Sequence, residues 1–76
     1  MTGTPAASSC SQRQRLAEVV QQHLQRISQL SRATSEALAN GNENLMQALD
    51  KEVELEIGAK ERALGALREH RKEHGC

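Results

Sequence analysis

The triplet Asn40-Gly41-Asn42 lies near the middle of the 76-residue chain, between two long stretches that carry apolar residues at helical spacing. Gly41 can adopt the left-handed backbone conformation that ends a helix. The flanking Asn40 and Asn42 favour turns and caps because their short amides bond to nearby backbone groups. The triplet therefore predicts the end of one helix and the start of another.

The apolar positions on either side of the triplet alternate in steps of three and four residues, which is typical of a heptad-like helical seam. Before the triplet they are Leu16, Val20, His23, Ile27, Leu30, Thr34 and Ala37, and after it they are Met46, Leu49, Val53, Ile57, Lys60, Leu64, Leu67 and Arg71. A chain that folds back at Gly41 brings together residues whose numbers sum to about 83. Leu16 then faces Leu67, Leu30 faces Val53, and Ile27 faces Ile57 or Glu56.

These stripes predict an all-α fold, an antiparallel two-helix hairpin with a coiled-coil-like seam. The alternative is one continuous helix of about 60 residues, which the triplet would only weaken. The coincidence of helix breakers and cap signals at one point favours the hairpin. Residues 1–8 are small and polar and are expected to form a disordered tail. The hairpin domain then covers residues 9–76, with helices over about 9–39 and about 43–74, a turn at 40–42, and Gly75 as the stop.

The composition excludes several classes of protein. Ten acidic and ten basic residues cancel, and Phe, Tyr and Trp are absent, which argues against neutralising phosphates and against stacking on nucleic-acid bases. No apolar run is long enough to span a membrane, and the first residues do not resemble a secretory signal. We therefore expect a soluble, cytoplasmic protein with no membrane partner, in which the two cysteines are free thiols by default.

A chain of this size rarely buries enough apolar surface to be stable alone. Leu55 and the alanines 48, 59 and 66 lie away from the main stripe of the second helix, where another helix could approach. We expect self-association into a four-helix-bundle homodimer, or binding to another helical protein. The alternative is that Leu55 is simply one exposed leucine among many.

The open end of the hairpin is predicted to gather four possible metal ligands. His70 and His74 share one helical face, and the fold-back register brings Cys10 toward residue 73, close to Cys76. A zinc ion here would hold the two termini together. The alternatives are a Cys10–Cys76 disulfide under oxidising conditions, or no site at all. The H-x-x-E-H match over residues 70–74 is attributed to chance, because a hydrolytic site needs a third ligand and a closed pocket.

The predicted seam is interrupted by polar residues at one level. His23 and Lys60 face each other in the register described above, and such a polar layer can fix helix register and partner number. The alternative is that both side chains extend to the edge of the seam and reach water. Neither has an obvious nucleophile or acid partner, so the sequence predicts no catalytic residues.

The sequence thus favours a small noncatalytic interaction or regulatory module that acts through self-association or through binding a partner helix. The alternative is a small zinc-binding or thiol-redox protein that uses Cys10, His70, His74 and Cys76, with no other cofactor expected. An RNA-binding hairpin dimer is a third and less favoured possibility.

Overall fold

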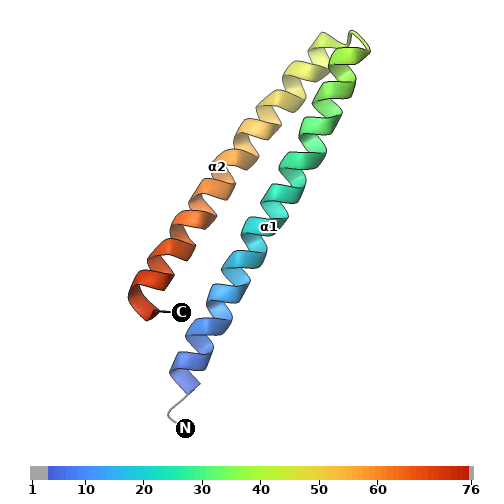
Figure 1. Cartoon of the computed structure of the whole chain (residues 1–76). Coiled ribbons are helices and arrows are strands. Elements are labelled where there is room, and N and C mark those ends of the chain that lie inside the picture. Colours follow the sequence, from blue (N-terminus) through green and yellow to red (C-terminus); the bar gives the residue numbers. More distant parts are fainter. Residues whose placement is uncertain (1–3, 76) are drawn as a thin grey trace.

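The computed structural model of the chain is a hairpin of two α-helices, α1 (Thr4–Ala39) and α2 (Glu43–His74). It describes residues 4–75, with side chains described from residue 11 onward. The helices run antiparallel and side by side, so that the start of α1 and the end of α2 lie at the same end of the molecule (Figure 1). The Cα atoms extend over 61 × 15 × 12 Å, the shape of a thin rod. The predicted all-α hairpin is confirmed.

The turn is built by the triplet that the sequence singles out. Gly41 has φ +74°, and its N–H donates to the carbonyl of Leu38 at 3.0 Å, while the N–H of Asn42 donates to the carbonyl of Ala37 at 2.9 Å. This pair of bonds is a Schellman motif, which satisfies the last carbonyls of α1. The side chain of Asn42 then accepts from the N–H of Leu45 at 3.2 Å, so Asn42 also caps α2. One residue serves both helices, which keeps the connection short.

The outer ends of the helices are partly as predicted. α2 ends at His74 before Gly75, which has φ +69° and donates from its N–H to the carbonyl of Arg71 at 2.9 Å. α1 begins at Thr4, five residues before the expected start. Pro5 falls in the first turn, where a helix needs no N–H donor and where the fixed φ of proline suits helix geometry. Residues 1–3 lie outside the described residues.

The core is small. Among residues 11–75, the buried hydrophobic side chains are Val20 and Ala37, which are 8% and 4% exposed, and no side chain is fully buried. The other residues of the seam are half-buried, including Leu16, Leu30 and Leu67. A two-helix hairpin can cover each helix along one stripe only, so the flanks of that stripe remain in contact with water.

The stripe on α2 differs from the prediction at three points. At one of them the regular spacing selects Ala63 where Leu64 was expected, and both are half-buried. Glu56 is half-buried where Ile57 was expected, and Ile57 is 40% exposed. His70 is 6% exposed where Arg71 was expected, and Arg71 is exposed. The reason is geometric, because steps of three and four residues that start at Met46 and Leu49 continue strictly along α2. The predicted stripe departed from this regular spacing by one residue, because it was chosen to include apolar side chains. Glu56 is thus the half-buried member of the two residues predicted to face Ile27.

Candidate functional site

A carboxylate within the seam is the centre of the main polar cluster. The Oε1 atom of Glu56 on α2 lies 2.7 Å from Nδ1 of His23 on α1, and its Oε2 accepts a hydrogen bond from Nε of Arg26 at 3.0 Å. Arg26 and His23 are three residues apart, so both reach the same point from one face of α1. The side chains of Glu56 and His23 are 18% and 25% exposed, whereas that of Arg26 is 59% exposed. The cluster therefore ties the two helices together at mid-length.

The electrostatics of this cluster favour the ionised carboxylate. The hydrogen bond from His23 holds the pKa of Glu56 below its usual value, and the positive charge of Arg26 acts in the same direction against the cost of partial burial. For Nδ1 of His23 to donate to Glu56, the imidazole must carry its proton on that nitrogen. The arrangement is an ion pair between Arg26 and Glu56 with a hydrogen bond from His23 to the same carboxylate, and it joins the two helices.

His23 and Lys60, the predicted polar layer, are both half-buried in the seam, and their side chains contact two different carboxylates. Lys60 is half-buried, as expected for a seam position, and its Nζ lies 3.0 Å from a carboxylate oxygen of Glu61. This hydrogen bond lowers the pKa of Glu61. His23 instead bonds Glu56, which lies one helical turn away from Lys60. Each donor thus has a carboxylate partner on α2, which is a better neighbour than a second donor. Glu56 was not predicted as a member of this cluster, although the fold-back register places it opposite Ile27.

Two of the four predicted metal ligands lie together at the open end. The ring centroids of His70 and His74 are 4.6 Å apart, with the ring planes tilted by 46°. Both rings line a depression to which α1 contributes Gln12 and Leu16. The side chain of Cys10 and the whole of Cys76 lie outside the described residues. Within the part that the structure describes, no three His, Cys, Asp or Glu side chains are grouped closely enough to hold a metal ion.

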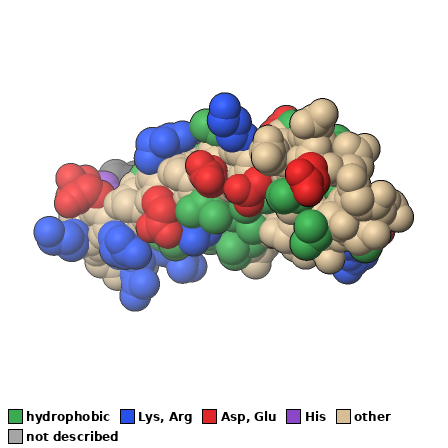
Figure 2. Space-filling model, turned by 90° about the horizontal axis from the view of Figure 1, so that it is seen from above, with side chains coloured by type: hydrophobic (Ala, Val, Ile, Leu, Met, Phe, Trp, Pro, Cys, Tyr) green, Lys and Arg blue, Asp and Glu red, His purple; other side chains and the backbone are tan. Residues whose placement is uncertain are grey.

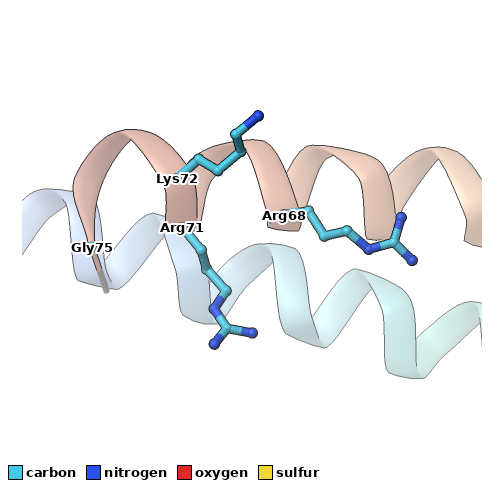
Figure 3. A pocket seen from close by; sticks show the side chains of 4 residues that line it. All are labelled: Arg68, Arg71, Lys72 and Gly75. Carbon is cyan, nitrogen blue, oxygen red and sulfur yellow. The ribbon is translucent and has the colours of Figure 1, made fainter.

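The basic residues at the end of α2 do not form a convergent anion site. Arg68, Arg71 and Lys72 line a groove with Gly75. In the view of Figure 3, the side chain of Arg71 extends over the ribbon of α1, that of Lys72 extends to the other side of α2, and that of Arg68 extends along α2. The three charged ends therefore point apart in this structure. Basic side chains at this position are favourable because the C-terminal end of a helix carries partial negative charge.

Exposed apolar side chains are the other notable feature of the surface. Among residues 11–75, six large hydrophobic residues are more than a third exposed, from Val19 at 39% to Leu55 at 73%; the others are Leu24, Leu38, Leu45 and Ile57. Figure 2 shows hydrophobic side chains open to solvent near the middle of one face, with acidic side chains beside them and basic ones concentrated toward one end. Over the described residues, neither helix contains a segment long and apolar enough to cross a membrane. Comparison of the chain with protein-family models, with curated proteins and with solved structures gives no match.

Proposed function

We propose that this chain is a noncatalytic interaction module that acts by packing its exposed apolar side chains against further helices. Those helices belong either to a second copy of the chain or to another helical protein. The observation that carries the proposal is the imbalance between the core and the surface. Two hydrophobic side chains are buried among residues 11–75, and six large ones are more than a third exposed.

The physical argument concerns stability. Burial of apolar surface is the main favourable term in folding, and it grows with the area removed from water. A small hairpin that leaves Leu24, Leu55 and Ile57 partly in water forgoes much of that term. Contact with another helical surface would supply it, and folding would then be linked to binding. The polar clusters support a noncatalytic role, because their charged groups are engaged in ion pairs. Glu56 pairs with Arg26 of the other helix, and Lys60 pairs with Glu61 of the same helix.

The test is the concentration dependence of folding. Circular dichroism melts of the whole reduced chain, from about 1 to about 200 µM, should give a melting temperature that rises with concentration, because association stabilises the folded state. Sedimentation equilibrium over the same range should show species larger than a monomer. A strictly monomeric protein with a cooperative melt that does not change with concentration would contradict self-association. If that monomer also bound no helical partner on co-purification from its native cell, the proposal as a whole would fail.

A second candidate function is zinc binding or thiol chemistry at the open end. The observation in its favour is the contact between the rings of His70 and His74, which lie one turn apart on α2. Zinc titration into reduced protein should then raise the helicity and the melting temperature. The His74→Ala and Cys10→Ser variants should lose that response, and the Arg71→Ala variant should keep it. If the native protein takes up no zinc, the zinc-binding form of this candidate is excluded.

A further inference from the structure

One flank of α2 has an acidic residue at one end, a basic residue at the other end, and two apolar residues between them. The α2 flank consists of Asp50, Ile57, Leu64 and Arg71, which are spaced by seven residues and each follow a half-buried or buried seam residue. Asp50 and Arg71 are exposed, Ile57 is 40% exposed and Leu64 is half-buried. Along α2 the flank therefore has an acidic residue, two apolar residues and a basic residue. Its midpoint lies between Lys60 and Glu61.

This pattern is suited to two-fold symmetry. In an isologous pair the same patch is used on both copies, so a residue on one side of the axis meets its counterpart from the other side. If two copies of α2 run antiparallel about the midpoint of the flank, Ile57 of each copy lies over Leu64 of the other. Asp50 then comes to Arg71. Glu54 precedes Ile57 by three residues and Arg68 follows Leu64 by four, so they add a second pair of opposite charges. Glu61 lies between them in the same row, and its carboxylate is already paired with Lys60 of the same helix at 3.0 Å.

We propose that the α2 flank is a homodimer interface, on which a second copy of the chain packs antiparallel with its own α2 flank. The inference rests on the proposed function and adds to it the identity of the partner, the face and the direction of packing.

The flank of α1 on the same side of the hairpin is compatible with this packing. In an antiparallel helix pair, the residues that directly follow the seam positions lie on one common face of the two helices. On α1 the residues that follow the seam positions are all uncharged, and so is Gln14, which extends the same spacing toward the N-terminus. The others are Ala17, Gln21, Leu24, Ser28, Ser31, Ser35 and Leu38. A second α1 could therefore cross them without burying an unpaired charge, which would be costly. The small side chains also permit close approach.

The distribution of charge along the whole rod favours the same direction. The half near the turn, residues 27–56, holds six acidic and two basic residues, whereas residues 11–26 and 57–75 together hold four acidic and eight basic ones. Packing two copies in parallel would place acidic half against acidic half. Antiparallel packing places each acidic half against a basic half, and complementary potentials also speed the encounter of two partners.

The available surface is sufficient for a stable dimer. A standard interface takes about 800 Å² from each partner, which is about one seventh of the 5683 Å² that this chain exposes. A rod 61 Å long offers that area along one face. About the same midpoint, the opposite flank, which holds Leu45 and Leu55, would place Glu52 of one copy opposite Glu69 of the other, and these are like charges.

The direction of packing can be measured with spin labels. In a background with Cys10→Ser and Cys76→Ser, a label is attached at an Asn44→Cys substitution, near the turn. Antiparallel packing about the midpoint separates the two labels by about 50 Å, twice the rise of the residues between Asn44 and that midpoint. Parallel packing would bring them to about 20 Å, the thickness of two helix layers. A label at Arg62→Cys lies close to the midpoint, so the two labels should be near each other in the antiparallel and in the parallel dimer alike. This short distance shows that a dimer has formed.

The assignment of the α2 flank as the interface can be tested with substitutions that neutralise its charges and leave its apolar side chains in place. Asp50→Asn with Glu54→Gln should raise the dimer dissociation constant about tenfold, because two-fold symmetry removes each weak ion pair twice. The matched control, Glu36→Gln with Glu52→Gln, makes the same change in net charge away from the α2 flank and should have a smaller effect. Added salt should weaken the native dimer.

The outcomes separate this inference from the proposed function. A short distance between labels at residue 44, tighter binding after neutralisation of Asp50 and Glu54, or equal effects of the two double variants would overturn the α2 flank while leaving self-association intact. A strictly monomeric chain would overturn the homodimer and leave only binding to another protein.

Discussion

Glu56 of α2 and His23 of α1 are joined by a 2.7 Å contact between Oε1 and Nδ1, which is a direct polar link between helices at mid-length of the hairpin. The two residues are 33 positions apart in sequence. A sliding of one helix by a turn would separate them and move a carboxylate among apolar side chains. The contact therefore contributes to the choice of register as well as to stability.

Replacing Glu56 should change the acid branch of the stability profile. The pKa of Glu56 is lower in the folded chain than the ordinary value of 4.5, chiefly because of the hydrogen bond from His23. A carboxyl group with a lowered folded pKa stabilises the protein above its unfolded pKa, and this contribution is lost as the pH falls through the folded value. We expect Glu56→Gln to lower the melting temperature at neutral pH and to flatten its decline below about pH 4.5. Melts of both proteins between about pH 3 and about pH 7 test this, and two parallel profiles would contradict it.

Replacing Gly41 should destabilise the hairpin through the backbone alone. Its φ is +74°, and a Cβ added there would meet no atom within 4 Å. Gly41→Ala should therefore cost about 1–2 kcal/mol, the penalty of a left-handed conformation for a residue with a side chain. Gly65 is the control, because it lies inside α2 with equally open surroundings. There the same substitution should stabilise by about 0.5–1 kcal/mol, as expected for alanine inside a helix. Urea titrations at one protein concentration compare the two, and effects of equal sign would contradict the assignment of the turn.

Two adjacent valines should respond very differently to truncation. Val20 is 8% exposed and Val19 is 39% exposed. Val20→Ala should cost about 1–2 kcal/mol, from lost burial and from the small cavity left in the seam. Val19→Ala should change the free energy of unfolding by less than about 0.5 kcal/mol, as is usual for partly exposed positions. The chemical change is identical, so a comparable loss at both positions would show that the seam is rotated relative to the structure.

Removing the cap of α2 should weaken the hairpin near the turn. The side chain of Asn42 accepts from the N–H of Leu45 at 3.2 Å. Asn42→Ala should cost about 1 kcal/mol, because that donor then depends on water. Asn44→Ala, two residues on and exposed, should be near neutral or slightly stabilising. Hydrogen exchange of the amide of Leu45 should accelerate in the first variant and stay unchanged in the second.

The features that local residue chemistry determines could be predicted from the sequence. Gly41 and Asn42 have few alternatives to a turn and a cap, so the connection and the bounds of α2 followed from them. Exposure was harder to predict, because Glu56 and Ile57 are adjacent and their hydrophobicity points to the wrong one for the seam. Periodicity alone, counted strictly from Met46, would have selected Glu56 and His70.

Side-chain partners within the seam were the least predictable part. The register places His23 level with Lys60, but a long side chain can bond one turn away, and the choice depends on where the opposite charge lies. His23 therefore bonds Glu56 and Lys60 bonds Glu61. The start of α1 at Thr4 also differs from the expected residue 9, and the capping pattern in the sequence did not indicate the earlier start.

The shortness of the turn has a consequence for how the chain reaches its folded state. Asn42 both completes the end of α1 and caps α2, so the first contacts between the helices close a very small loop at little entropic cost. Each further layer of contacts, from Ala37 outward to Leu16, adds only a few residues to the loop that the previous layer has closed. Contacts that form in this order have a low barrier, and helical proteins with local contacts fold fast. We expect the hairpin to fold by zipping from the turn, with the termini the last to join.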